Sequence, residues 1–200
     1  MILKTWVMAF RPKTLTAAVV PVFVATALLL PSDFPIRWWI TLAALASALF
    51  IQIGTNLIND GIDFKKGADD ENRLGPKRAT QSGLLKYKTV MAMGFVSFLI
   101  AIVCGIPLVM QGGWVIAGIG VVSLICGYAY TGGPYPLAYR GLGDLFVIIF
   151  FGIVAVGGVY YLHTEGFHLD ALVAGLQVGL LCTVLIAINK FNGAVSDKFI

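Results

Sequence analysis

The sequence predicts an all-α fold, a polytopic bundle of transmembrane helices that forms a single domain. Hydrophobic residues make up 58% of the 200 residues and charged residues only 12%, which is about half the charged share of a typical soluble domain. The apolar residues gather in six uncharged runs, each near the roughly 20 residues that a helix needs to cross a bilayer. Barrel strands would be shorter and would alternate with polar residues. The runs cover residues 14–30, 38–59, 89–110, 113–130, 145–162 and 171–188.

The basic residues predict which way the bundle faces. Lysine and arginine gather on the cytoplasmic loops of membrane proteins. With six spans and a cytoplasmic N-terminus, every lysine and arginine except Arg37 falls on the cytoplasmic side. We therefore expect an integral protein of the cell (inner) membrane, embedded in the lipid bilayer, with its N-terminus and its long loops in the cytoplasm. This arrangement accounts for the net charge of +4 at pH 7, so the charge does not indicate a nucleic-acid partner.

The first two spans have specific boundary signals. The run 14–30 follows Arg11 and Lys13, as the apolar part of a signal peptide would, but it ends at Pro31-Ser32-Asp33 without a small-residue cleavage site. We therefore interpret this run as the first span. The second run begins with Trp38-Trp39, and such aromatic pairs are typical of the membrane interface.

The later spans contain hairpin and packing signals. Only Gln111-Gly112 separates the third run from the fourth, which predicts a tight outer hairpin. Gly175 and Gly179 in the sixth run predict a close helix contact. On the outer side, His163-x-Glu165-x-x-His168 does not predict a metal site, because this separation does not place both imidazoles on one helical face. The cysteines lie inside spans without paired spacing and support neither disulfides nor zinc. They are Cys104, Cys126 and Cys182.

The second span runs into a polar stripe, which we predict to be the functional centre. Asn56, Asn59, Asp60 and Asp63 follow one another at offsets that place them on one face of a helix. A charged side chain near the bilayer centre costs roughly 2.5–3.5 kcal/mol on insertion scales, so such residues are seldom kept without a ligand. The alternative is a pair of carboxylates that cap the helix and pair with neighbouring lysines in solvent. That alternative explains either aspartate alone better than it explains the whole set.

Two long segments on the predicted cytoplasmic side follow the second and fourth spans. Residues 60–88 mix charges of both signs with glycines that mark turns. Residues 128–144 combine four tyrosines with Arg140 and Asp144, and we predict a binding loop there. An interfacial tyrosine belt is the alternative interpretation for any one of these tyrosines.

The composition of the stripe favours a divalent cation with oxygen ligands. Carboxylates within two helical turns repel one another and stay ionised together only beside a cation. Oxygen ligands without histidine or cysteine favour Mg²⁺ or Mn²⁺ over zinc. Basic residues shortly after the stripe are suited to bind phosphate oxygens that the metal does not cover. The residues therefore predict a site for a metal-bound diphosphate at the cytoplasmic face of the bundle.

The stripe and the loop after it resemble the first aspartate-rich motif of the UbiA superfamily of intramembrane aromatic prenyltransferases. The motif reads Asn56-x-x-Asn59-Asp60-x-x-Asp63-x-x-x-Gly67-x-Asp69-x-x-x-Arg73-x-Gly75-Pro76. The wider family has aspartate where Gly67 stands, and the presence of Asp69 two residues later resembles the 1,4-dihydroxy-2-naphthoate subgroup. Arg11-Pro12 and the Gly-Pro-Tyr-Pro run in 128–144 are also similar to the family, although Tyr139-Arg140 stands where relatives often have Lys-Arg. The resemblance extends from residue 4 to about residue 189.

The resemblance implies transfer of a polyprenyl chain from polyprenyl diphosphate to an aromatic acid, 1,4-dihydroxy-2-naphthoate, in menaquinone synthesis. Mg²⁺, or alternatively Mn²⁺, would neutralise the leaving diphosphate, and aromatic side chains would shield the allylic cation. The candidate catalytic residues are Asn56, Asp60 and Asp63, and the candidate metal ligands are Asp60, Asp63 and Asp69. The candidate diphosphate ligands are Arg11, Asn59, Arg73, Lys77, Arg78 and Arg140. The candidate contacts of the acceptor and the prenyl chain are Tyr128, Tyr130, Tyr139 and Asp144.

The C-terminal part departs from the family pattern. The family has about nine spans and a second aspartate-rich motif after the sixth, whereas here only Asp197 follows Asn189 before the chain ends. We therefore expect a prenyltransferase-like domain over residues 1–189 and a divergent tail over 190–200, produced by truncation or a frameshift. The hypothesis that follows is that this chain is inactive alone.

Three alternatives to this function remain. The first keeps the chemistry and changes the acceptor to another quinone or phenolic ring. The second is a non-catalytic remnant of the family, which the missing second motif favours. The third is a transporter, which should have polar residues deep in several spans, whereas only the second span has a polar stripe.

Overall fold

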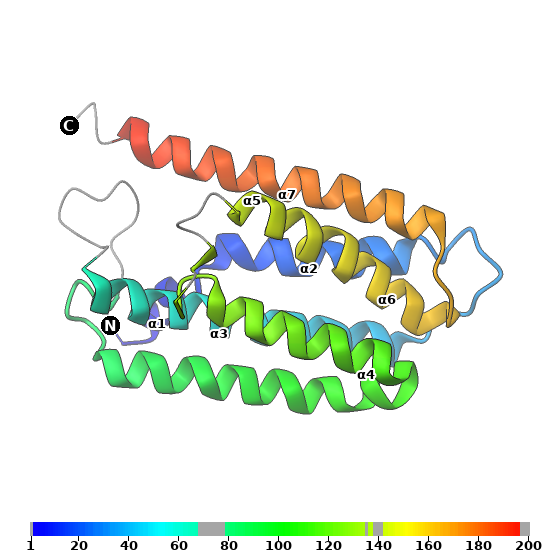
Figure 1. Cartoon of the computed structure of the whole chain (residues 1–200), viewed down its shortest axis with the longest axis horizontal. Coiled ribbons are helices and arrows are strands. Elements are labelled where there is room, and N and C mark those ends of the chain that lie inside the picture. Colours follow the sequence, from blue (N-terminus) through cyan, green and yellow to red (C-terminus); the bar gives the residue numbers. More distant parts are fainter. Residues whose placement is uncertain (1, 68–78, 135, 138–141, 197–200) are drawn as a thin grey trace.

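The computed structural model of the protein describes residues 2–67, 79–134, 136–137 and 142–196. These described residues form helices and connecting turns without a strand, and Figure 1 shows the long helices side by side in one bundle. The predicted all-α bundle is therefore confirmed. The elements are α1 (Ile2–Phe10), α2 (Pro12–Ala27), α3 (Trp38–Lys66), α4 (Tyr87–Ala129), α5 (Gly143–Val147), the π-helix η2 (Ile148–Val154), α6 (Ala155–Thr164) and α7 (Leu169–Ser196).

The first predicted span starts at a break between two helices. α1 and α2 meet at an angle of 52°, and Arg11 between them adopts the left-handed conformation (φ 53°, ψ 70°). Pro12 begins α2, a position where its missing N–H removes no helical hydrogen bond. The helix differs from the predicted span 14–30 at both ends. It begins earlier because of Pro12, and it ends at Ala27 because turns follow.

α4 consists of two antiparallel limbs. Gly113 adopts φ 62° and ψ −149°, a conformation that glycine reaches without the clash of a Cβ atom. Figure 1 shows the chain reversing direction within α4, so that residues 87–112 and 114–129 run in opposite directions. The predicted hairpin between the third and fourth runs is confirmed.

α5, η2 and α6 form one continuous helical rod, Gly143–Thr164. Its middle part is the π-helix η2, which packs on α7 through glycines. A Cβ atom on Gly152 would strike the backbone of Gly175 and Gly179. The predicted close contact of Gly175 and Gly179 is therefore confirmed, and its partner is the π-helix.

Among the described residues, three helices are long and apolar enough to cross a membrane, and the bent α1–α2 pair would make a fourth. The three are α3, α4 and the α5–α6 rod, whereas the apolar part of α7, Leu169–Leu185, is shorter. Large apolar side chains such as Leu99, Trp114 and Leu181 are exposed on the outer surface. An apolar surface of this kind suits lipid as the surrounding solvent, and the chain is an integral membrane protein.

Polar residues gather at the two ends of the bundle. The start of α1 and the end of α7 lie at the same end of the bundle (Figure 1), which is the first of the two. The aspartate end, as we call it, comprises Asn56, Asn59, Asp60 and Asp63 of α3 and Thr131 after α4. The opposite end comprises Arg37, Gln111, His163 and Glu165.

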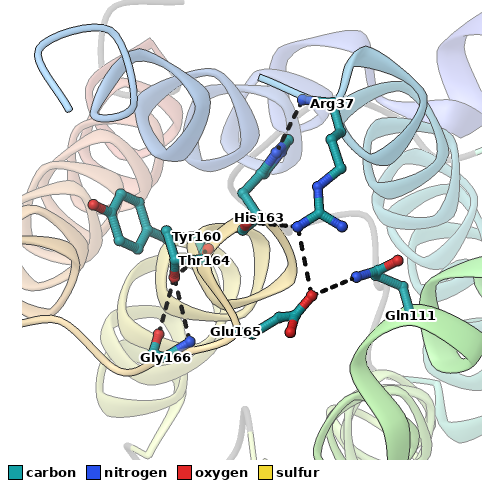
Figure 2. Close-up of polar contacts among 7 residues, drawn as sticks. All are labelled: Arg37, Gln111, Tyr160, His163, Thr164, Glu165 and Gly166. Carbon is teal, nitrogen blue, oxygen red and sulfur yellow. Dashed lines mark hydrogen bonds and ion pairs between the residues drawn. The ribbon is translucent and has the colours of Figure 1, made fainter. Parts of the chain in front are cut away.

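Figure 2 shows the polar contacts that connect different helices at the opposite end. The backbone N–H of Arg37 donates to Nδ1 of His163 at 3.3 Å, and its guanidinium donates to the His163 carbonyl oxygen at 2.9 Å. Glu165 lies 3.5 Å from the same guanidinium and accepts a hydrogen bond from Gln111 Nε2 at 3.0 Å. His163 is 1% exposed, whereas the Arg37 and Glu165 side chains are 32% and 64% exposed. A partly buried junction therefore joins the start of α3, the turn of α4 and the end of α6.

Candidate active site

The polar stripe of α3 is buried at the aspartate end. Asn56 and Asp60 are 3% and 2% exposed, and Asn59 and Asp63 are each 5% exposed. Their spacing places them on one helical face, and this face is directed into the protein. The structure therefore gathers in one buried stripe the four residues that the sequence singles out on α3.

Two glycines on α3 determine which of its faces meets α4. A Cβ atom on Gly54 would strike Phe98, and one on Gly61 would strike Met91. The first limb of α4 therefore packs closely against this side of α3, as small residues allow between membrane helices. The polar stripe lies on a different side of α3, where it meets the α1–α2 break and the end of α4.

Asn56 bonds to the break between α1 and α2. Its side-chain nitrogen donates to the Phe10 carbonyl oxygen at 2.9 Å and to Thr14 Oγ1 at 2.9 Å. Its side-chain oxygen accepts from Gln52 Nε2 at 3.4 Å. Asn56 thus links α3 to the segment that contains Arg11.

Asn59 is held by a residue that sequence reasoning missed. Thr131 donates from its hydroxyl to Asn59 Oδ1 at 2.6 Å, in a fully buried contact. Lys66 Nζ in turn donates to the Thr131 carbonyl oxygen at 2.7 Å. The only available signal was the place of Thr131 at the start of the tyrosine-rich segment, and a threonine there does not by itself indicate a partner on α3.

Tyr130, the residue after α4, lies where charged groups from several elements meet. Its pKa is raised above the usual 10.0, chiefly because burial disfavours the phenolate. The Asp144 carboxylate raises this pKa further, the Arg11 guanidinium lowers it, and the Asp63 carboxylate raises it. A Cβ atom on Gly143 would lie 3.3 Å from the Tyr130 hydroxyl oxygen, so α5 begins beside this ring.

The structure thus brings together residues that the sequence assigned to different ligands. Arg11, Asp63 and Asp144 come from different elements, and the charge of each acts on Tyr130 at the aspartate end. Tyr128 is placed differently, because its ring stacks on Phe95 with centroids 6.5 Å apart and is 40% exposed. The remaining candidates lie outside the described residues. They are Asp69, Arg73, Lys77, Arg78, Tyr139 and Arg140.

A cavity adjoins this region through Tyr130, which lines it, whereas the four residues of the polar stripe do not. It has a volume of about 570 Å³, and its walls come from α2, α3, both limbs of α4 and the α5–α6 rod. Tyr130, Gln52 and Thr55 line it near the aspartate end, whereas Leu108 and Leu162 line it near the opposite end. Nearly all of its other lining residues are apolar, so the cavity suits a long hydrocarbon chain more than a polar solute.

The described donor set fits a hard divalent cation. Asp60 and Asp63 stand on adjacent turns of α3 and offer only oxygen atoms, and one or two carboxylates are what Mg²⁺ usually takes from a protein beside phosphate and water. Within the described ranges, histidine, cysteine, aspartate and glutamate form no group of three or more that could hold a metal ion. The third predicted ligand, Asp69, lies outside those ranges.

The fold and the site define a helical membrane protein with a buried carboxylate site at one end of an apolar cavity. A sequence model described as the UbiA prenyltransferase family matches residues 18–198. The chain belongs to this family.

Named relatives are similar over nearly the whole chain. The 1,4-dihydroxy-2-naphthoate octaprenyltransferase of Bacillus subtilis (strain 168) is 35% identical over 94% of this chain and 60% of the relative. The enzymes of the same name from Haemophilus influenzae and Mycobacterium tuberculosis are 32% and 36% identical, over 98% and 92% of this chain. The chain spans 60%, 66% and 63% of the length of these three curated relatives.

Proposed function

We propose that this chain is the donor-binding part of a membrane prenyltransferase that attaches a polyprenyl chain to 1,4-dihydroxy-2-naphthoate in menaquinone synthesis. The observation that carries the proposal is that α3 holds the buried Asp60–Asp63 pair and, earlier on the same helix, Gln52 and Thr55 in the wall of an apolar cavity. A polyprenyl diphosphate has a matching shape, with a polyanionic head and a long apolar tail. The names of the relatives support the same choice of acceptor.

The cavity would hold the prenyl tail. Its volume of about 570 Å³ falls within the roughly 300–1,000 Å³ of ordinary ligand pockets. Few polar side chains line the cavity. Ser47 and Ser123 are among these few. The affinity for the prenyl tail would therefore come chiefly from burying the apolar surface of the tail away from water and lipid headgroups.

The aspartate end would bind the diphosphate head. Arg11 would pair with phosphate oxygens, and the Asn59 amide, whose oxygen already accepts from Thr131, would donate its N–H groups to them. The loop residues Arg73, Lys77, Arg78 and Arg140 are suited to the same task. Mg²⁺, or Mn²⁺ with the same preference for oxygen, held by Asp60, Asp63 and Asp69, would supply the positive charge that stabilises diphosphate as a leaving group.

Aromatic side chains would stabilise the reacting end of the prenyl chain. Phe146 and Phe150 stack with centroids 5.5 Å apart and an interplanar angle of 6°, and both line the cavity beside Tyr130. Their π-faces would stabilise positive charge as the allylic C–O bond breaks and its electrons leave with diphosphate. The carbon of the naphthoate ring that bears the carboxylate would then form a bond to the allylic carbon of the prenyl chain. The carboxylate would leave as carbon dioxide, and its bonding electrons would return to the ring. Tyr130, Tyr139 and Asp144 would hold the acceptor, and Tyr128 would contact it only from outside the cavity.

The distribution of basic residues supports an orientation in which the aspartate end faces the cytoplasm. Every lysine and arginine except Arg37 would then lie on the cytoplasmic side. In the cell membrane, a site of this protein that opens to the cytoplasm would be accessible to the charged diphosphate group of the donor. Cysteine labelling in intact cells tests this. Lys65→Cys and Arg37→Cys are made separately in a chain whose Cys104, Cys126 and Cys182 are replaced by alanine. Only the cysteine at position 37 should react with a reagent that does not cross the membrane.

Binding of the donor is the experiment that tests the function. The purified chain in lipid nanodiscs should bind a labelled polyprenyl diphosphate only with Mg²⁺ present, and Asp60→Asn should weaken the binding by about 100-fold. Asp170→Asn, at an exposed carboxylate of α7, is the matched control and should bind as the unaltered chain does. An unaltered chain that does not bind the donor would contradict the proposal. Adding 1,4-dihydroxy-2-naphthoate then tests whether the chain alone transfers the prenyl group.

A second candidate keeps the donor and changes the acceptor. A relative from Synechocystis, named 2-carboxy-1,4-naphthoquinone phytyltransferase, is 28% identical over 97% of this chain, so similar chains are named for more than one aromatic acceptor. Competition between 1,4-dihydroxy-2-naphthoate and a hydroxybenzoate for the donor-loaded chain decides between them. Preferential binding of the benzoate would favour the second candidate.

A further inference from the structure

The geometry at the α1–α2 break points to Asn56 as a positioning residue, which holds Arg11 in place and does not itself touch metal or diphosphate. This inference rests on the proposed function, because Arg11 has a diphosphate to bind only if that function holds. It also changes the role that the sequence assigns to Asn56, which is a catalytic one.

The hydrogen bonds of Asn56 use both of its donors, and burial encloses the rest of the side chain. Its side-chain nitrogen carries two hydrogens, and these are directed to the Phe10 carbonyl oxygen and to Thr14 Oγ1, each at 2.9 Å. Its oxygen accepts from Gln52 Nε2 at 3.4 Å. With 3% of its surface exposed, Asn56 is enclosed by groups of the protein, and both of its donors are used.

At the break between α1 and α2, the Phe10 carbonyl oxygen accepts its hydrogen bond from Asn56. In a continuous helix the Phe10 carbonyl would accept from the Thr14 N–H. Here the Thr14 N–H donates to the Arg11 carbonyl at 2.8 Å, and Thr14 Oγ1 donates to the same oxygen at 2.9 Å. The Phe10 carbonyl therefore takes its hydrogen bond from Asn56, and losing that bond would leave a polar group without a partner inside the protein.

The hydrogen bonds of Asn56 stabilise an unusual backbone conformation at Arg11. Arg11 is held at φ 53°, a conformation that residues with a Cβ atom rarely adopt and that persists only where neighbouring contacts enforce it. This turn places its positive charge close enough to act on Tyr130 together with Asp63 and Asp144. Asn56 would thus determine where the guanidinium stands in the site.

Binding of inorganic pyrophosphate with Mg²⁺, measured by calorimetry on the full chain in detergent, tests the inference. Asn56→Asp keeps the shape and an oxygen ligand but removes both donors. We expect its pyrophosphate affinity to fall by about tenfold or more, since a buried carbonyl then loses its partner. A metal ligand would behave differently, because the added charge would preserve or increase the affinity for Mg²⁺ and pyrophosphate. That result would overturn the inference.

Thr14→Val provides a milder variant that does not alter Asn56. It removes the second acceptor of the Asn56 amide, so we expect a smaller loss of affinity in the same direction. Thr16→Val is the matched control, because Thr16 Oγ1 bonds only to the Lys13 carbonyl on the exposed side of the same helix. Equal effects of the two valine variants would contradict a specific role for the Asn56–Thr14 contact.

A double-mutant cycle separates positioning from direct contact. If Asn56 acts through Arg11, then Asn56→Asp should add little to the loss already produced by Arg11→Gln. Additive losses would show that Asn56 has its own contact with the ligand and would overturn the inference. Hydrogen exchange of residues 2–16 should also rise in Asn56→Asp, because the break loses its support.

The outcomes distinguish this inference from the proposed function. An unaltered chain that binds no pyrophosphate with Mg²⁺ would refute both. An unaltered chain that binds, with additive losses in the cycle, would refute the positioning role and leave the proposed function standing. Binding with non-additive losses supports both.

Discussion

The two ends of the bundle hold their polar groups in different ways. At the opposite end the contacts close on one another, because Arg37 pairs with Glu165 and bonds to His163, and Gln111 completes the set. At the aspartate end one helix buries two carboxylates on adjacent turns, beside an apolar cavity. Opposite charges are paired at the Arg37–Glu165 end, whereas two neighbouring carboxylates on one helix favour a bound cation. A pair of buried carboxylates is therefore the better guide to a binding site in this bundle.

The largest difference between the two ends should appear in donor binding when the Asp60 carboxylate of the aspartate end is neutralised. Asp60→Asn keeps the shape of the side chain and removes a buried charge. We expect Mg²⁺-dependent binding of polyprenyl diphosphate to weaken by about 100-fold, as losses of buried charged partners do. Unchanged donor binding in this variant would remove the distinction between the ends.

At the opposite end the same kind of change should affect stability instead. His163→Phe removes the acceptor of the Arg37 N–H and the ring contact with Thr41 Oγ1 at 3.4 Å. We expect the free energy of unfolding to fall by about 1–3 kcal/mol, since a buried donor loses its partner. Donor affinity of the folded fraction should stay the same. Denaturant unfolding in detergent measures the first quantity, and a loss of affinity without a loss of stability would reverse our assignment.

A smaller effect should follow at the aspartate end when Asn59 loses its support. Thr131→Val matches the shape of threonine and removes the hydroxyl that donates to Asn59 Oδ1. We expect donor affinity to fall by about three- to tenfold, in line with the loss of one hydrogen bond. Thr183→Val is the control, because its hydroxyl bonds only to the Gly179 carbonyl of its own helix. Isothermal titration of both variants shows whether the loss is specific to Thr131.

The smallest expected effect concerns alkaline pH. The pKa of Tyr130 is raised in the folded protein, so the folded state holds this proton more tightly than the unfolded state does. The resulting stabilisation is complete below the ordinary pKa of 10.0 and is lost as pH rises through the higher folded value. Tyr130→Phe should flatten the fall in melting temperature above that pH. An identical pH profile in both proteins would show that Tyr130 is not in the charged surroundings described here.

The sequence predicts the features of the fold that depend on local pattern. Apolar runs reveal helices because lipid requires them, and Gln111-Gly112 indicates the reversal that the structure completes at Gly113. The pair Gly175 and Gly179 predicts a close contact but not its partner, because nothing in the run 145–162 indicates that a π-helix forms there. The boundaries of the domain, residues 1–189, and the nature of the tail remain predictions.

The site is predictable where one helix carries it and not where tertiary contacts build it. Spacing alone places Asn56, Asn59, Asp60 and Asp63 on one face. It does not reveal that Asn56 bonds to the α1–α2 break or that Thr131 bonds to Asn59, because those partners are far apart in the chain. Their roles in binding, like those of the loop residues, remain predictions.

Photo-crosslinking would test most directly whether the aspartate end and the cavity bind one ligand. A polyprenyl diphosphate with a photoreactive group on its tail should label peptides that line the cavity, such as those containing Phe150 and Leu162. Excess pyrophosphate with Mg²⁺, or the Asp60→Asn substitution, should abolish that labelling. Labelling confined to outward-facing residues such as Leu99 and Leu181, and unaffected by pyrophosphate, would contradict the account.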